Sequence, residues 1–257
     1  MTTPLRVVDT GLNAARHNVA ITAAIAELHR TGQSPDTLRF HLSPPSVVVG
    51  RDRGVGEDVN LRHCRRQGIV VARRQTAGET FYLSPGILAW DAVAERRRFG
   101  ASRAALAEAI CGGIAAALSR FGLPARHRPI DTVDIAGSKI CIAGGMCEGP
   151  TVVYQGAVMV AFNVRDMAAA LGQRVERMTS LAAFLGRVPD MAEVRAVLTA
   201  GLADAWQAEA QPGTLTTYET ALAERLLLSE IGLDTYVAGS EDAAATKLRT
   251  RRRRRLS

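Results

Sequence analysis

Long apolar segments and aromatic residues are scarce in this sequence of 257 residues, in which aromatics make up 5%. Its charge-free runs, such as residues 19–26 and 110–118, fall short of the roughly 18 apolar residues of a membrane-spanning helix. The start, MTTPLRVVDT, lacks a charged segment followed by an apolar stretch and a small-residue cleavage site. The sequence therefore predicts a cytoplasmic protein that does not cross a membrane.

Cysteine and histidine are too few and too scattered to indicate a metal centre or a disulfide framework. The four cysteines show no CxxC spacing, and only His63 and Cys64 are adjacent among the possible ligands. Neighbouring side chains rarely converge on one ion, because metal-binding residues are normally spaced along the chain. We therefore expect no metal site, and we expect the thiols to be packing residues.

An excess of positive charge is absent from most of the chain, although the net charge is +7. Residues 247–257 hold seven basic groups and no acid, which leaves 25 basic and 25 acidic residues in residues 1–246. A neutral body offers no basic face for the phosphate backbone of a nucleic acid. We therefore do not expect a nucleic-acid partner, and residues 240–257 are predicted to be a disordered basic tail.

Lysine is the scarcest of the common charged residues. Of the 32 basic residues only Lys139 and Lys247 are lysines, and Lys247 belongs to the tail. The compact ammonium of lysine can do chemistry that a planar guanidinium cannot. Lys139 is therefore the first residue to examine for a catalytic role.

The composition, with 47% apolar and 22% charged residues, is that of a globular protein. Apolar periodicity and turn residues predict a mixed α/β body in residues 1–187. The predicted strands lie at residues 38–42, 47–49, 69–72, 87–93, 132–135, 139–143 and 151–164. The predicted helices of the body lie at residues 12–31, 58–67 and 102–121.

The pattern changes after residue 187. Asp190 with Glu193, and Thr216 with Glu219, have the spacing of helix capping boxes, and apolar stripes follow both. Residues 188–239 are therefore predicted to be a small helical extension packed on or beside the body.

Three segments carry glycines and charged residues in a specific order, at residues 45–82, 128–145 and 153–164. The first runs from PSVVVGR through VNLRHC to RRQTAGETFY, the second contains GSKI around Lys139, and in the third Gly156 stands 17 residues after Lys139. Together they resemble the lipoate-protein ligase and octanoyltransferase family, which shares its catalytic fold with the biotin-protein ligases.

The resemblance implies an α+β fold, a biotin/lipoate ligase-like catalytic domain with a central mixed sheet flanked by helices. It implies attachment of a lipoyl or octanoyl group to a lysine of a lipoyl-carrier domain, either through an acyl-adenylate made with ATP and magnesium or by transfer from an existing thioester. Lipoate or octanoate would be the small-molecule substrate, and the carrier would be the protein partner.

The resemblance also implies the roles of individual residues. Lys139 would be catalytic, since an ammonium between a carboxylate and a phosphate stabilises charge on the acyl oxygen and the leaving group. Arg73 or Arg74 would grip a phosphate, and the loop at 76–78 would bring backbone N–H groups to it. The predicted binding residues are Arg73, Arg74, Thr76, Gly78, Glu79, Thr80, Phe81, Tyr82 and Asp131.

One loop departs from the family pattern. The family's Ser-Gly-Gly-Gly reads Thr76-Ala77-Gly78-Glu79, so that a carboxylate stands where phosphate would bind. Two like charges about 4 Å apart repel by roughly 4 kcal/mol at an effective dielectric near 20. Four interpretations stay open: Glu79 turns away, holds magnesium, pairs with an arginine, or the chain does not form an adenylate.

One further departure and the altered glycine loop favour rival interpretations. The thiol-dependent transferases of the family use a cysteine on a later loop, but residues 165–190 contain none, which leaves Cys141 and Cys147 as candidates. The altered glycine loop is also compatible with a non-catalytic relative that binds a lipoylated carrier or a sister subunit. An ATP-independent acyltransferase is the remaining alternative.

Overall fold

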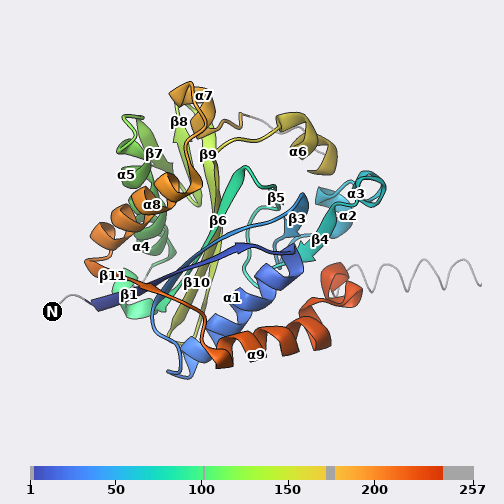
Figure 1. The fold of residues 1–257 in the computed structure, drawn as a ribbon, viewed down its shortest axis with the longest axis horizontal. Helices are drawn as coiled ribbons and strands as arrows, with labels where there is room; N and C mark the ends of the chain where they lie inside the picture. The colour runs from blue at the N-terminus through green and yellow to red at the C-terminus, as the bar shows by residue number, and fades with distance from the viewer. Residues whose placement is uncertain (1–2, 101, 172–176, 240–257) are drawn as a thin grey trace, which may run out of the picture.

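A computed structural model describes residues 3–100, 102–171 and 177–239 of the chain. At its centre lies an eight-stranded sheet in the order β11-β1-β2-β6-β10-β9-β8-β7 (Figure 1). Its strands are β1 (Thr3–Leu12), β2 (Thr37–Leu42), β6 (Ile87–Glu95), β7 (Ala125–Arg128), β8 (Thr132–Ile135), β9 (Ser138–Glu148), β10 (Thr151–Met159) and β11 (Ala208–Gly213). β1 pairs in parallel with β11 and β2, whereas the other pairs are antiparallel, so the sheet is mixed.

A second sheet has three strands in the order β4-β3-β5. They are β3 (Ser46–Val49), β4 (Val70–Arg73) and β5 (Phe81–Leu83), with β3 parallel to β4 and antiparallel to β5. Short helices α2 (Val55–Asp58) and α3 (Leu61–Gln67) connect β3 to β4. Residues 74–80 connect β4 to β5 and include the Thr76–Glu79 loop, so the small sheet holds this loop at both ends.

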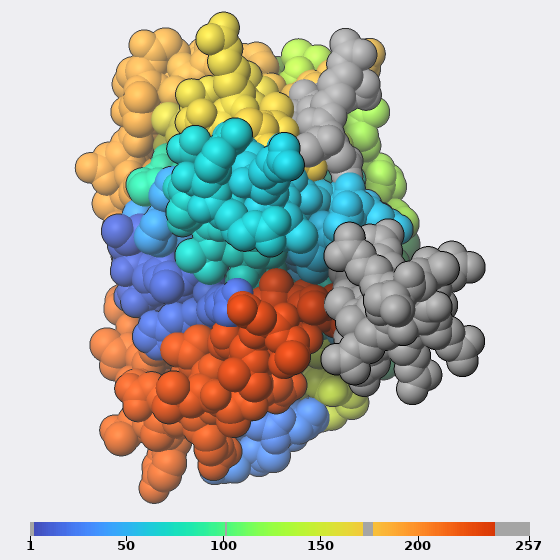
Figure 2. All heavy atoms as spheres, turned by 90° about the vertical axis from the view of Figure 1, so that its right-hand side faces the viewer, coloured from blue at the N-terminus to red at the C-terminus, as the bar shows by residue number. Residues whose placement is uncertain are grey.

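Helices cover both faces of the large sheet. One face carries α4 (Arg103–Ala107), the π-helical segment η2 (Glu108–Gly112), α5 (Gly113–Ser119) and α8 (Met191–Ala205), after a short 3-10 turn η1 (Arg96–Phe99). The other carries α1 (Ala15–Arg30), the small sheet, α9 (Thr217–Leu226) and the π-helical segment η3 (Leu227–Ile231). Two further helices, α6 (Val164–Leu171) and α7 (Leu181–Leu185), follow β10. Figure 2 shows α9 and η3 (red) below α2 and α3 (cyan), with α6 (yellow) above them.

The two helical layers explain why β10 reads as a nearly unbroken apolar run. All nine of its residues are buried. Val153 and Ala157 pack in the core on the side of α1, whereas Val152 and Val158 pack in the core on the side of α5 and α8. A strand covered on both faces needs apolar residues at successive positions rather than at alternate ones.

The structure confirms the predicted fold class, a mixed α/β architecture with a central mixed sheet flanked by helices. It also confirms the predicted capping box of Thr216 and Glu219 at the start of α9. Asp190 caps α8 by accepting from Ala192 N, but Glu193 pairs with Arg187 instead of completing the second box. Ser102 accepts from Ala105 N and caps α4. The predicted strand at 151–164 is too long, because β10 ends at Met159 and α6 begins at Val164.

The segment at 188–239 contains a strand as well as the predicted helices. β11 has the sequence AEAQPG and pairs with β1 at the edge of the large sheet. Its polar residues and proline hide the strand pattern, since an edge strand faces solvent and can include proline. The division at residue 187 stays a prediction, and the predicted tail at 240–257 lies outside the described residues. No helix in the described ranges is long and apolar enough to span a membrane.

Candidate active site

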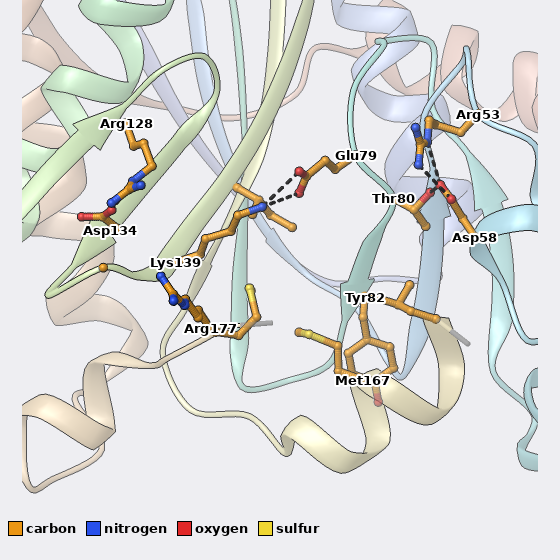
Figure 3. A pocket seen from close by; sticks show the side chains of 14 residues that line it. Arg53, Asp58, Glu79, Thr80, Tyr82, Arg128, Asp134, Lys139, Met167 and Arg177 are labelled. Atoms are coloured by element: carbon orange, nitrogen blue, oxygen red, sulfur yellow. Dashed lines mark hydrogen bonds and ion pairs between the residues drawn. The ribbon is translucent and has the colours of Figure 1, made fainter. Parts of the chain in front are cut away.

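A cavity of about 430 Å³ opens beside β9, between the two sheets and α6. Its size is within the range of small-molecule sites. Figure 3 shows Lys139 and Glu79 meeting in it, between the Arg128 and Asp134 side chains and those of Arg53 and Asp58. The lining residues are Arg53, Asp58, Glu79, Thr80, Tyr82, Arg128, Asp134, Gly137, Lys139, Ile142, Met167, Leu171, Arg177 and Met178.

Lys139 and Glu79 form an ion pair in this cavity. The Nζ atom of Lys139 donates to Oε1 and Oε2 of Glu79 at 3.0 and 3.1 Å. The lysine side chain is 33% exposed and that of Glu79 58%, so a ligand can reach both groups. The backbone of Lys139 is held by the segment that precedes α7, since its N–H donates to Arg177 O at 2.6 Å and its carbonyl accepts from Thr179 N at 2.9 Å.

Most other charges in the cavity are paired. Arg53 donates two hydrogen bonds to Asp58, at 2.8 and 2.9 Å, and Arg128 pairs with Asp134. Of the lining cations within the described part of the chain, Arg177 is the one with no carboxylate partner. Among the described lining residues, four are cations and three are carboxylates, an excess of one cation.

One wall of the cavity is apolar. Tyr82, Ile142 and Met167 are buried there, and Leu171 and Met178 are half-buried beside them. Burial raises the pKa of the Tyr82 phenol, so this group is neutral at physiological pH. The wall lies next to Lys139, which places an apolar surface beside a charged group, as in small-molecule sites.

Arg73 lies outside the cavity, and its guanidinium is fully occupied by the backbone. It donates at 2.8 to 3.2 Å to five carbonyl oxygens. These carbonyls belong to Gly50, Arg51, Arg53, Val237 and Ala238. In the described structure this side chain therefore ties the small sheet to the C-terminal segment.

Arg74 is also buried outside the cavity. Its Nε donates to Thr76 Oγ1 at 2.9 Å, its Nη2 to Ala77 O at 3.1 Å, and its guanidinium lies 4.1 Å from the centre of the Phe81 ring. Burial lowers the pKa of Arg74 to about 9, which leaves the group cationic at neutral pH. The contacts of Arg74 place Thr76 and Phe81 inside the protein as well.

The loop between β4 and β5 packs directly on β9. A Cβ atom on Gly144 would lie 2.3 Å from the carbonyl oxygen of Ala77, so a side chain there would displace the loop. Gly78 has a φ of +110°, which favours glycine, and its N–H donates to Asp52 Oδ1 at 3.1 Å. The loop is thereby fixed on both sides before the chain reaches Glu79.

The ten predicted site residues divide into two groups. Lys139, Glu79, Thr80 and Tyr82 line the cavity, and Thr80 donates to Asp58 at 2.6 Å. Asp131 does not line it, because its carboxylate accepts from Tyr154 and from Arg103, the latter at 2.9 Å. The other predicted residues outside the lining are Arg73, Arg74, Thr76, Gly78 and Phe81.

Several cavity residues were not predicted from the sequence. Asp58 and Asp134 lie within the family-like segments, but their pairing with Arg53 and Arg128 has no local signature. The remaining lining residues outside these segments are Met167, Leu171, Arg177 and Met178, which the topology brings over Lys139 from after β10.

None of the four cysteines lines the cavity, and all four lie in the described part of the chain. Cys64, Cys111 and Cys141 are buried, and burial raises the pKa of the Cys141 thiol to about 12. Cys147 is exposed and borders a different cavity, beside Gly145 and Tyr154. The site therefore presents no thiol to an acyl group in the Lys139 cavity.

The sequence is similar to enzymes that handle lipoyl and octanoyl groups. An octanoyltransferase LipM of Symbiobacterium thermophilum is 28% identical over 271 residues, which cover 92% of this chain and 98% of that protein. Lipoate-protein ligase A subunit 1 of Thermoplasma acidophilum is 26% identical over 235 residues, which cover 82% of this chain and 87% of that protein.

The fold is similar to that of solved ligases. A bi-partite lipoate protein ligase from Thermoplasma acidophilum superimposes with a TM-score of 0.82 at 23% identity, over 93% of this chain and 97% of that chain. The family model described as the lipoyl protein ligase A/B catalytic domain matches residues 14–203, which include all three family-like segments and the whole lining of the cavity. The chain therefore belongs to the family of lipoyl protein ligase A/B catalytic domains.

Proposed function

We propose that this chain attaches a lipoyl or octanoyl group to a lysine of a lipoyl-carrier domain, and that Lys139 is its catalytic group. The observation that carries the proposal is the Lys139 ammonium, paired with Glu79 beside an apolar wall in the cavity. The names of the relatives support the lipoyl or octanoyl chemistry. The acyl chain would lie on the wall formed by Tyr82, Ile142 and Met167, with its carbonyl towards Lys139.

In the reaction, the neutral amine of the carrier lysine attacks the acyl carbonyl carbon. A C–N bond forms, the bond to the leaving group breaks, and the amine loses a proton to water. The Lys139 ammonium stabilises the negative charge that develops on the carbonyl oxygen and on the leaving group. Glu79 would hold the ammonium in place between turnovers.

We propose an acyl-adenylate as the activated donor. An enzyme-bound thioester would need a thiol near the reacting carbonyl, whereas no cysteine lines this cavity. An acyl-adenylate carries one phosphate charge, which suits the excess of one cation among the described lining residues. Arg177, which has no carboxylate partner in the lining, would be the residue that pairs with that phosphate.

The fit to ATP and magnesium is weaker than the fit to the adenylate. Mg²⁺ usually binds through one or two carboxylates together with substrate phosphates. Asp58, Glu79 and Asp134 are the carboxylates among the described lining residues, and each is paired with a cation. Within the described ranges no group of three metal-binding side chains lies together. Magnesium would therefore enter with the nucleotide rather than occupy a site of its own.

Direct transfer from an octanoyl thioester of a second carrier is the other candidate, and the octanoyltransferase names of several relatives favour it. In this route the carrier thiol leaves in place of adenylate, and Lys139 again stabilises the carbonyl oxygen. The remaining lining residues would keep the same roles.

Intact-mass analysis of an apo lipoyl-carrier domain tests the proposal. The carrier is incubated with the protein and either octanoate with Mg-ATP or an octanoyl-carrier thioester. We expect one added acyl group with the wild type, none with Lys139→Ala, and a wild-type result with Lys247→Ala as the matched lysine control. If only the octanoyl-carrier thioester serves as a donor, direct transfer and not the acyl-adenylate is the route. If neither donor acylates the carrier, the proposed function is overturned.

A further inference from the structure

A chain of hydrogen bonds runs through the interior from β6 to the loop that carries Glu79. It begins at Asp91, which is buried and accepts from Arg39 Nε at 2.9 Å. Gln155 on β10 donates from Nε2 to Asp91 Oδ1 at 2.8 Å, and its Oε1 accepts from Thr76 Oγ1 at 2.9 Å. Thr76 in turn accepts from Arg74 Nε at 2.9 Å. We call these four linked residues, Asp91, Gln155, Thr76 and Arg74, the relay.

The direction of every bond in the relay is fixed by chemistry. Asp91 is ionised, because its partners, Arg39 first, outweigh its burial and hold the pKa of the carboxyl well below its usual range. A carboxylate only accepts, so the amide NH₂ of Gln155 must face it and the amide oxygen must face Thr76. The single hydroxyl proton of Thr76 is then donated to Gln155, which leaves its lone pairs for Arg74.

The relay ends on the loop beside Lys139. Arg74 donates to Ala77 O at 3.1 Å and to Val48 O at 3.3 Å, which links the loop to β3. The carbonyl of Ala77 is also the atom that lies against Gly144 of β9. Two residues further on, Glu79 reaches Lys139.

We infer that Gln155 and Thr76 are positioning residues, which set the place of the Ala77–Glu79 segment over β9 and thereby the place of Glu79 against Lys139. Neither side chain lines the Lys139 cavity. They act through Arg74 and the Ala77 carbonyl. The inference rests on the proposed role of Lys139 in acyl transfer.

Thr22 on α1 provides a matched control. Its hydroxyl donates to the same carboxylate as Gln155, to Asp91 Oδ2 at 2.9 Å, and it is buried to a similar degree. Thr22 belongs to α1, and among the described residues its hydroxyl is linked to the loop only through Asp91. Thr22→Val and Thr76→Val therefore each remove one buried hydroxyl from the same network, but only Thr76→Val cuts the relay.

The scarcity of lysine allows a direct measurement of the Lys139 environment. Reductive ¹³C-methylation labels Lys139, Lys247 and the N-terminal amine. The methyl signal of Lys139 is assigned by its loss in Lys139→Arg and followed by NMR. We expect Thr76→Val to move this signal towards its position in Glu79→Gln, whereas Thr76→Ser and Thr22→Val keep the wild-type position. An unmoved signal in Thr76→Val, or an equal movement in Thr22→Val, would overturn the inference.

Turnover gives the second readout. We expect Thr76→Val to lower kcat for carrier acylation on the order of 10- to 100-fold, as for small misplacements of reacting groups, with little change in the KM for the carrier. Thr76→Ser should have the wild-type kcat. Thr22→Val should also have the wild-type kcat, with a Tm comparable to that of Thr76→Val. Equal kcat values for Thr76→Val and Thr22→Val would count against the inference. If Thr76→Val does not fold, Gln155→Leu is compared with Thr22→Val in its place. An inactive wild type would refute the proposed function alone, since the NMR result still decides the relay.

Discussion

Glu79 places both carboxylate oxygens against the ammonium of Lys139, at 3.0 and 3.1 Å. One of the four interpretations that the sequence left open pairs Glu79 with an arginine, whereas in the structure its partner is Lys139. The ion pair orients Lys139 into the cavity, but an anionic ligand must share the ammonium with Glu79.

Glu79→Gln should therefore strengthen the binding of nucleotide. The repulsion between Glu79 and a phosphate is smaller than for buried charges, because Glu79 is 58% exposed. We expect the KM for ATP to fall roughly fivefold, which corresponds to about 1 kcal/mol. The KM is measured by titrating ATP in the carrier acylation assay, and Glu224→Gln on the exposed face of α9 is the control. A higher KM would instead indicate that Glu79 holds magnesium.

Loss of the exposed thiol should leave acylation intact. Cys147 is the exposed cysteine, and it lies outside the Lys139 cavity. The buried Cys141 has a pKa of about 12, so its thiolate is scarce at neutral pH. We expect Cys147→Ser, Cys141→Ala and the wild type to acylate the carrier at rates within about twofold, allowing for small packing effects. A thiol route would be established if one of these variants failed to acylate the carrier and the wild type carried an acyl adduct on the corresponding cysteine.

Much of the fold could be predicted because its patterns are local. The caps at Ser102, Asp190 and Thr216 lie within four residues of the amides that they bind. The edge strand β11 could not, because its sequence is polar and its partner β1 lies about 200 residues away in the chain. Pairing at such a separation leaves no periodic signal in either segment.

The site shows the same division. The family-like segments include Lys139 and Glu79, which the structure brings together. The sequence could not tell which way Arg73 points, because two of the carbonyls that it binds belong to Val237 and Ala238, more than 160 residues later. Arg177 lies in the cavity because the chain after β10 and α6 passes beside Lys139. One arginine among thirty has no sequence pattern that would predict this position.

Gly144→Ala should displace the loop that presents Glu79. The added Cβ would lie 2.3 Å from Ala77 O, a backbone atom that cannot rotate away. We expect a loss of about 1–3 kcal/mol in unfolding free energy, as for other overpacked sites, and a marked fall in acylation. Denaturant unfolding and the mass assay measure the two effects. Gly56→Ala is the control, since a Cβ there has no neighbour within 4 Å, and equal behaviour of the two variants would contradict the packing argument.

A buried carboxylate fastens α9 to the large sheet. Glu219 is 1% exposed and accepts from Arg6 on β1, from Ser34 at 2.7 Å and from the Thr216 amide at 2.7 Å. Burial alone would raise the pKa of Glu219, but these hydrogen bonds outweigh it and the pKa is lowered. The folded state therefore favours the ionised form.

This shift makes part of the stability pH-dependent. A carboxyl whose pKa is lower in the folded than in the unfolded protein contributes stability above its unfolded value of 4.5, and loses it as the pH falls through the folded value. Glu219→Gln should cost about 2 kcal/mol at pH 7, as for a hydrogen-bonded charged group, and progressively less below pH 4.5. Urea unfolding at pH 7 and at pH 3.5 measures the difference, with the exposed Glu209→Gln as the control. A difference between wild type and Glu219→Gln that stays constant over this range would show that neutral hydrogen bonding, and not the charge, holds α9 on the sheet.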